Sequence, residues 1–280
     1  MQKGKAFVWL MIWATNIVLL AQVHHLPSSR LHMYVFDVGQ GDAILLTTPS
    51  GKHILIDGGP DLSLLEHLGR TMPFFNRTID LLIITHPNTD HLFAIPFLLQ
   101  HYHVRAALLS PAPSSLPTYG SILQALLQKK IPILSPSPGT DIRFRDGVLL
   151  DILWPPRTTH KNWEEDANNS SIVLRAIYGN QRILLTGDIE EKAEMAILAS
   201  GTNIQSTILK VAHHGSQTST STGFLLASSP QSAIISVGRN NRYKHPHPNV
   251  LSRLLHFGIR TTTTAENGTV LGGFYGFLWP

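Results

Sequence analysis

Several short apolar runs in this chain lead into histidine or aspartate, and this pattern constrains the fold more than any other feature. The run 81–85 is almost continuously apolar, which is typical of a strand buried on both faces. His86 follows this run directly, and runs of the same kind precede Asp188, His213 and His245. Because functional groups in α/β sheets gather at the carboxyl ends of strands, we expect these side chains to converge.

Predicted strands and helices alternate along the chain, which indicates a layered α/β fold with two sheets. Expected strands lie at 33–38, 43–48, 53–57, 81–85, 106–109, 149–153, 172–178, 183–186, 207–212 and 233–237, and further strands close the chain. Expected helices lie at 62–68, 92–100, 122–129, 190–199, 224–227 and 250–257. Pro96 is expected to break or kink the second helix, and the prolines and serines of 110–117 predict a loop.

The chain contains no cysteine and 15 histidines. Disulfides and thiolate ligands are therefore excluded, and any transition metal must be held by imidazole and carboxylate groups. The net charge of +4 and the pI of about 9.4 permit contact with phosphate-rich partners. They do not establish such contact, because the basic residues are thinly spread.

The segment from His86 to His91 contains two imidazoles and the carboxylate of Asp90 within six residues. Pro87 restricts the backbone, and a short turn lets these side chains and position 88 aim at one point. Such a set suits zinc, manganese or iron. Taken alone, the segment also fits a helix N-cap followed by surface histidines.

Simpler interpretations exist for the later strand ends as well. Gly187 and Asp188 fit a turn that caps a helix near Glu190, and the adjacent His213 and His214 fit one ring facing the core and one facing water. Four separate strand ends that each present histidine or aspartate are explained most economically by convergence on a metal ion.

Two glycine-rich segments near the start supply carboxylates at Asp37, Asp42 and Asp57. Their glycines permit tight turns with positive φ. Neither segment matches a phosphate-binding loop or a dinucleotide fingerprint. We therefore expect these three carboxylates to orient the ligand histidines.

Residues 6–23 form an apolar segment of 18 residues that follows Lys3 and Lys5. The segment is just long enough to span a bilayer, and the lysines would hold the N-terminus in the cytoplasm. We expect residues 1–30 to be an uncleaved hydrophobic anchor helix with its linker, and residues 31–280 to form a domain outside the cytoplasm. The alternatives are a cleaved signal peptide, which would make the domain secreted, and a buried core helix.

Seven segments in order resemble the metallo-β-lactamase superfamily, and in particular the hydrolase domain of ComEC-type DNA-uptake proteins. They are DVGQGD (37–42), ILIDGG (54–59), THPNTDH (85–91), NSSIVL (169–174), LTGD (185–188), LKVAHHGS (209–216) and NRYKHPH (241–247). The resemblance covers the chain from about Tyr34 to the C-terminus. It implies a four-layer αβ/βα sandwich with a metal site at one edge, between the two sheets.

Carried over to this chain, the resemblance implies one or two Zn²⁺ or Mn²⁺ ions. His86 and position 88 would serve the first ion, Asp90 and His91 the second, and Asp188 would bridge them. Either His213 or His214 would complete the second site. Asp57 would support the ligands, and His247 would lie near the substrate.

The chain departs from the family pattern at three places. Asn88 stands where an aspartate or histidine is usual, and because an amide oxygen is a neutral and weaker ligand, the first ion would be bound weakly or lost. Residues 92–94, Leu-Phe-Ala, replace smaller residues, and Lys244 stands where a glycine is common.

The resemblance implies hydrolysis, and the basic pI favours a phosphodiester substrate. A bound ion lowers the pKa of water from 15.7 to roughly 7, and Asp90 or Asp188 would orient or deprotonate that water. His247 is the third catalytic candidate.

The substrate-binding candidates are basic residues of one loop, which would stabilise charge on a phosphoryl oxygen. They are Arg242, Lys244 and His245, with Arg239 nearby. The same cationic cluster also fits an ordinary solvated loop.

Three functions follow from these features. The first is a membrane-anchored phosphodiesterase or nuclease that acts on nucleic acid. The second is a hydrolase of the same fold acting on another ester, such as a phosphorylcholine group, or on a lactam. The third is a binding module without activity, in which Asn88 marks a decayed site and the partner is a DNA-uptake channel protein.

Overall fold

The computed structural model describes residues 9, 11–13, 15, 16, 30–156, 163 and 166–272. Residues 9, 11–13, 15 and 16 are helical, but within the described residues no helix has the length and apolar character needed to cross a membrane. Most of the expected anchor, 6–23, lies outside the described residues, as do the rest of the linker before residue 30 and the end of the chain after residue 272.

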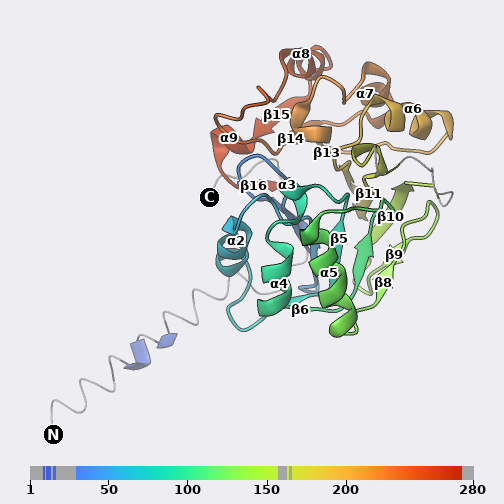
Figure 1. Ribbon diagram of the computed structural model, residues 1–280. Helices are drawn as coiled ribbons and strands as arrows, with labels where there is room; N and C mark the ends of the chain where they lie inside the picture. The colour runs from blue at the N-terminus through green and yellow to red at the C-terminus, as the bar shows by residue number, and fades with distance from the viewer. Residues whose placement is uncertain are drawn as a thin grey trace, which may run out of the picture.

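The first sheet contains, in spatial order, β16 (Val270–Gly272), β1 (His32–Val35), β2 (Ile44–Thr47), β3 (His53–Ile56), β5 (Leu81–Ile84), β7 (Ala107–Leu109) and β8 (Ile133–Leu134). From β3 to β8 its neighbouring strands are parallel. Its outer face is covered by α2 (Ser63–Thr71), α4 (Ile95–His101) and α5 (Pro117–Gln128) (Figure 1). The short helix α3 (Thr89–Leu92) follows β5, and β4 (Thr78–Ile79) pairs with β6 (His103–Val104) in a separate small sheet.

The second sheet contains, in spatial order, β15 (Arg260–Thr263), β14 (Ser232–Ile235), β13 (Ile208–Lys210), β12 (Gln181–Leu185), β11 (Val173–Tyr178), β10 (Leu149–Trp154) and β9 (Ile142–Arg143). From β12 to β15 the strands are parallel. Its outer face is covered by α6 (Glu191–Ala199), α7 (Thr222–Ser228) and α8 (Pro248–His256). Two 3-10 turns (Asn168–Ser170 and Ala212–Gly215) and the short helix α9 (Thr264–Asn267) complete the described elements.

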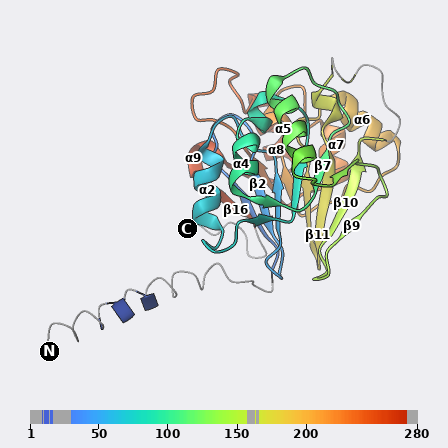
Figure 2. The same ribbon diagram turned by 60° about the horizontal axis from the view of Figure 1, so that its bottom comes forward.

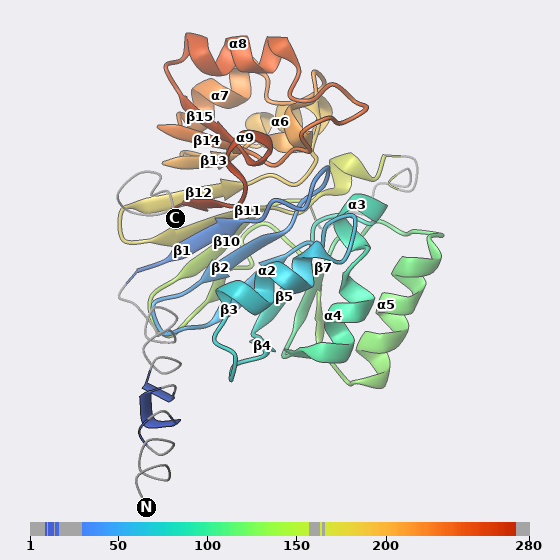
Figure 3. The same cartoon turned by 90° about the vertical axis from the view of Figure 1, so that its left-hand side faces the viewer.

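Alternation of side chains along each strand builds the layers. In β5, Leu81 and Ile83 pack between the two sheets, whereas Leu82 and Ile84 pack against the helices of the first sheet. Leu184 of β12 likewise packs against the helices of the second sheet. Both faces of the central strands are therefore buried, which explains the continuous apolar runs. Figures 2 and 3 show the two sheets packed together with helices on both outer sides.

The predicted α/β fold with two sheets and four layers is therefore confirmed. The expected break near Pro96 is present, since the predicted helix 92–100 is interrupted between α3, which ends at Leu92, and α4, which begins at Ile95 with Pro96 in its first turn. The loop predicted at 110–117 ends one residue earlier than expected, because Pro117 begins α5. The physical reason is the same at both sites, because proline fits the first turn of a helix, where its missing N–H costs no hydrogen bond.

Candidate metal centre

The polar strand ends predicted to converge do meet, at the carboxyl edge of both sheets. β5 leads to His86, and α3 then presents Asp90 and His91. In the second sheet, β12 leads to Asp188, and β13 leads to the turn that contains His214. Because β3 and β5 are parallel neighbours in the first sheet and β12 and β13 are parallel neighbours in the second, their carboxyl ends lie side by side. Packing of the two sheets then brings the polar residues of both sheets together.

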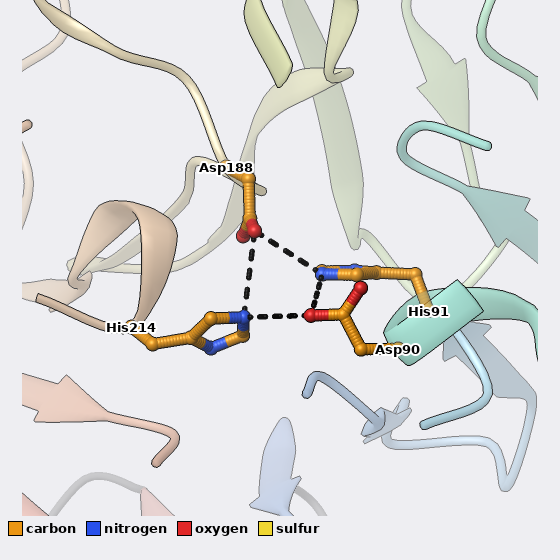
Figure 4. A group of neighbouring side chains, drawn as sticks. All are labelled: Asp90, His91, Asp188 and His214. Carbon is orange, nitrogen blue, oxygen red and sulfur yellow. Dashed lines mark ion pairs between the residues drawn. The ribbon is translucent and has the colours of Figure 1, made fainter. Parts of the chain in front are cut away.

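Asp90, His91, Asp188 and His214 form a compact group of possible metal ligands (Figure 4). Asp188 Oδ2 lies 3.3 Å from His91 Nε2 and 3.4 Å from His214 Nε2. Asp90 Oδ2 lies 3.4 Å from His214 Nε2 and 3.9 Å from His91 Nε2. Four donors placed tetrahedrally about 2.0–2.2 Å from an ion are about 3.3–3.6 Å apart. The group therefore has the dimensions of a metal site.

Several buried atoms of this centre have no hydrogen-bond partner among the described residues. They are Nε2 of His86, His91 and His214 and Oδ1 of Asp188. An unsatisfied buried polar atom costs about 1–3 kcal/mol, so a cluster of them calls for a ligand. Imidazole nitrogen and carboxylate oxygen are donors that suit Zn²⁺ or Mn²⁺. These residues fit a divalent cation.

Asp57 holds the ring of His91 from behind. Its Oδ2 lies 2.8 Å from His91 Nδ1, which leaves Nε2 directed at Asp188. Asp57 also accepts hydrogen bonds from the backbone N–H of Thr85 at 2.8 Å and from its hydroxyl at 2.6 Å. Carboxylates in this position fix the tautomer and orientation of metal-binding histidines.

His214 is held in place by an unusual backbone conformation. His213 and His214 have φ values of 48° and 53°, in the left-handed region. Such residues cost about 1–3 kcal/mol each and persist only where other contacts hold them. His214 Nδ1 lies 2.9 Å from the carbonyl oxygen of Ser236, which directs Nε2 at Asp188.

A buried ion pair connects His214 to the first sheet. Asp42 Oδ1 lies 3.5 Å from His214 Nδ1, and Asp42 Oδ2 lies 2.8 Å from Lys210 Nζ. All three side chains are buried. Sequence reasoning missed Lys210, whose only signal was its place between apolar residues just before the histidine pair. Removing one partner of a buried ion pair costs about 3–5 kcal/mol of stability. Lys210 therefore stabilises the carboxyl edge of the sheets, where the metal ligands lie.

Electrostatic contacts set the protonation of the metal-free centre. Burial lowers the pKa of His214, but Asp188 and Asp90 outweigh burial and raise it to about 10. Burial opposes ionisation of Asp90, but His91 and His214 outweigh it and lower the Asp90 pKa to about 2. The pKa of His91 is raised for the same reason, since burial is outweighed by neighbouring carboxylates. Protons thus occupy positions that a cation would take.

A second possible metal position, around His86 and Asn88, has fewer ligand atoms directed at it. His86 Nε2 lies 3.9 Å from Asp188 Oδ2, and burial together with the charge of His91 lowers the His86 pKa to about 3. The side-chain amide of Asn88 instead donates a 2.8 Å hydrogen bond to Asn168 Oδ1. The structure therefore brings His86 to the centre but engages Asn88 elsewhere.

His213 lies beside the group of four and faces Glu190. Its Nε2 is 4.0 Å from Asp188 Oδ2, and its Nδ1 is 3.2 Å from Glu190 Oε1, without hydrogen-bond alignment. Glu190 also accepts hydrogen bonds from the Thr218 hydroxyl at 3.1 Å and the Asn168 amide at 3.5 Å. Sequence reasoning read Glu190 only as the start of a helix and missed this contact.

The basic loop after β14 borders the centre through His245. The rings of His213 and His245 lie 5.7 Å apart, and burial and the charge of His213 lower the His245 pKa to about 4. A hollow of about 660 Å³ adjoins His245 and is also lined by Arg239 and Lys244. Lys244 has a φ of 58°, a conformation that glycine adopts at no steric cost.

Three of the predicted site residues have other contacts in the structure. Asp37 accepts a 3.4 Å hydrogen bond from the N–H of Gly39, which shapes a turn. Arg242 is exposed and donates to the hydroxyl of Tyr243 at 2.7 Å. His247 caps α8, where its Nδ1 accepts a hydrogen bond from a backbone N–H. Of the two histidines in this loop, His245 is the one that contacts His213.

Comparison with known proteins agrees with this geometry. The chain is 32% identical over 274 residues to ComE operon protein 3 of Bacillus subtilis, covering 91% of this chain and 34% of the relative. It is 29% identical over 255 residues to competence protein ComA of Neisseria gonorrhoeae, covering 88% of this chain and 33% of that relative. The chain thus spans about a third of the length of these relatives.

The fold is shared with the metallo-beta-lactamase fold protein YhfI from Bacillus subtilis, with a TM-score of 0.55 at 12% identity, covering 86% of this chain and 100% of that one. The family model of the metallo-beta-lactamase superfamily matches residues 36–239, which include the four converging ligands. The chain therefore belongs to the metallo-beta-lactamase superfamily.

Proposed function

We propose that this protein is a metal-dependent phosphodiesterase of the nuclease type. Its Zn²⁺ or Mn²⁺ ion would be held by Asp90, His91, Asp188 and His214. The observation that carries the proposal is the convergence of ligand atoms from both sheets, several of them buried and without a hydrogen-bond partner among the described residues. Membership of the superfamily supports hydrolysis, and the competence protein among the relatives agrees with a nucleic-acid substrate.

When bound, a divalent cation supplies Lewis acidity, which polarises a phosphoryl oxygen and makes water a stronger acid. The two carboxylates of the centre differ in access, since the side chain of Asp90 is 36% exposed and that of Asp188 is 2% exposed. Asp90 is therefore the carboxylate placed to orient an attacking water and accept its proton. Asp188 remains shielded and holds the two imidazoles in position.

The basic loop supplies the contacts for the substrate. Arg239 and Lys244 line the hollow with positive charge, which Glu266 offsets in part, and His245 lies between the hollow and the metal centre. Positive groups beside a bound phosphodiester would stabilise the charge that grows on its phosphoryl oxygens. His245, which its lowered pKa of about 4 leaves neutral near pH 7, would act as a hydrogen-bond donor to the substrate and not as a positive charge. His247 is less suited to this role, because its Nδ1 atom is engaged at the N-terminus of α8.

The cellular setting is the second part of the proposal. The apolar segment 6–23 would anchor the protein in a membrane, and Lys3 and Lys5 would place the domain outside the cytoplasm. A DNA-uptake channel protein is the proposed partner, in keeping with the sequence resemblance. A reporter fused after Pro280 that is active only in the cytoplasm would contradict this orientation.

The test of activity uses the full-length protein with single-stranded DNA and a chromogenic phosphodiester, each with Mn²⁺ or Zn²⁺. We expect cleavage of both substrates, loss of cleavage in Asp90→Ala, and unchanged cleavage in the matched control Asp141→Ala at the far edge of the second sheet. Turnover of a lactam or a phosphorylcholine ester without phosphodiester cleavage would favour another hydrolase. If the protein neither binds metal nor hydrolyses any of these substrates, a binding module without activity would be the favoured function.

A further inference from the structure

We infer that the edge of the domain opposite the metal centre is a contact surface for anionic phospholipid headgroups. This basal edge consists of the loop 73–77, the strands β4 and β6, and the end of α5 with Lys129 and Lys130. The inference rests on the membrane anchoring proposed above and adds an orientation to it, in which the metal centre points away from the bilayer.

Strand registers fix the position of the basal edge. His32 at the start of β1 pairs with Thr47, which in turn pairs with His53 at the start of β3. Ile54 then pairs with Leu81 at the start of β5. The chain therefore enters the domain at the amino ends of these strands, only a few residues after the apolar segment 6–23. The metal ligands lie at the opposite, carboxyl ends.

Positive charge gathers at this edge. A hollow of about 450 Å³ is lined by His103, Arg105, Lys129 and Lys130, and no acidic residue of the described part of the chain lines it. Asp80 lies nearby and contacts the side chains of Arg105 and Lys52 at 3.3 Å each, so it offsets part of the charge. Clustered basic residues at a membrane surface bind the phosphate groups of anionic lipids.

Two exposed aromatic residues lie beside the basic hollow. Phe74 and Phe75 are 62% and 63% exposed, and their rings make an edge contact at 5.4 Å. The loop that contains them leads directly into β4, and Thr78 of β4 pairs with His103 of β6. Apolar rings next to cations match the membrane interface, where rings enter the acyl boundary while cations remain among the phosphates.

A nucleic acid is the competing occupant, because it is also a polyanion. Two observations favour the membrane. The apolar segment adjoins this edge in sequence, and the metal centre lies at the opposite edge, so a phosphodiester bound at the basal edge would not reach it. Figure 1 shows the separation, with β6 near the bottom of the folded domain and α3 well above it.

The chain has no cysteine, so single cysteines can be labelled cleanly in the full-length protein. Phe74→Cys places an environment-sensitive fluorophore at the basal edge, and Leu255→Cys places the matched control on the exposed side of α8. Both proteins are reconstituted into vesicles of phosphatidylcholine with phosphatidylglycerol that contain spin-labelled lipid. We expect quenching at position 74 to exceed that at 255 by at least about threefold, since interfacial groups enter about 5–10 Å.

Charge variants test the recognition itself. The double change Lys129→Gln and Lys130→Gln should lower the docked population by about fivefold per lysine, whereas Lys192→Gln on α6 should leave it unchanged. Omitting phosphatidylglycerol should have the same effect as the double change. Equal quenching at positions 74 and 255 would overturn the inference, whether or not the protein remains in the vesicles.

Failure of the anchor is distinguishable from failure of this surface. Suppose that the protein is quenched at position 74 but is released from the vesicles by an alkaline wash. This result would support the lipid-contact surface and contradict the membrane anchor. Binding of single-stranded DNA that responds to the lysine changes, without lipid quenching at position 74, would instead identify a nucleic-acid surface and overturn the inference.

Discussion

Two neighbouring positions at the carboxyl edge differ in how completely they are built. In one, Asp90, His91, Asp188 and His214 bring their donor atoms within 4.8 Å of one another. In the other, His86 lies 3.9 Å from Asp188, but the side-chain amide of Asn88 bonds to Asn168 and contributes no ligand atom. The two positions share Asp188 and the same strand ends. A neutral amide in the ligand loop therefore belongs to a hydrogen-bonded network, whereas the carboxylate two residues later faces the ligand imidazoles.

Removal of the shared carboxylate should have the largest effect. Asp188→Asn keeps the size of the side chain but removes the charge that lies 3.3–3.4 Å from two ligand imidazoles. Loss of a residue that only supports a ligand weakens metal binding by about 10–100-fold, so loss of this ligand should exceed about 100-fold. Competition with a chromogenic chelator measures the change. An affinity within tenfold of the unaltered protein would place the ion elsewhere.

The pH dependence of metal binding should be nearly as large. The raised pKa values of His91 and His214 mean that both rings carry protons when no metal is bound. The stabilisation from protonated His214 is present below the ordinary pKa of 6.5 and is lost as the pH rises through about 10. Metal must displace these protons, so binding should tighten as the pH rises above about 7, by roughly 100-fold per pH unit where both rings still carry a proton. Calorimetry in buffers of different ionisation enthalpy should detect release of about two protons. Release of none would contradict the assignment.

Asn88→Asp should strengthen only the incomplete position. A carboxylate beside His86 and Asp188 offers a charged oxygen in place of a neutral amide, and this should tighten a second ion by about tenfold. The affinity of the first ion should change little, because Asn88 does not belong to the group of four. Metal titration followed by elemental analysis separates the two ions. Loss of the first ion in this variant would show that the two positions are not independent.

Asn168→Ala should have the smallest effect. It removes the acceptor of the 2.8 Å bond from Asn88 and should lower the free energy of unfolding by about 1 kcal/mol. Urea unfolding measures this change, and the affinity for the first ion serves as the control. A large loss of tight metal binding would mean that the network supports the complete position too.

The sequence predicted the fold and the convergence of the strand ends well, because both depend on local patterns. Continuous apolar runs such as 81–85 report strands buried on both faces, and the two sheets follow from them. The helix break near Pro96 was predicted correctly, whereas Pro117 was assigned to the preceding loop, because a proline that begins a helix and a proline in the loop before it look alike without the helix boundary.

Side-chain direction could not be predicted in the same way. His213 and His214 follow one strand, and only the left-handed turn directs His214 into the group of four. Lys210 was missed because its partner, Asp42, lies in a loop of the other sheet, far away in the sequence. Glu190 was missed because a helix start explains an acidic residue without any further contact.

The assignment of Asp90, His91, Asp188 and His214 as metal ligands is tested by the metal content of the full-length protein and two single variants. The structure predicts one tightly bound divalent ion, its loss in His214→Ala, and its retention in His213→Ala, because only His214 contributes to the complete position. Elemental analysis after exhaustive dialysis gives the answer. Absence of tightly bound metal, or equal loss in both variants, would contradict the account.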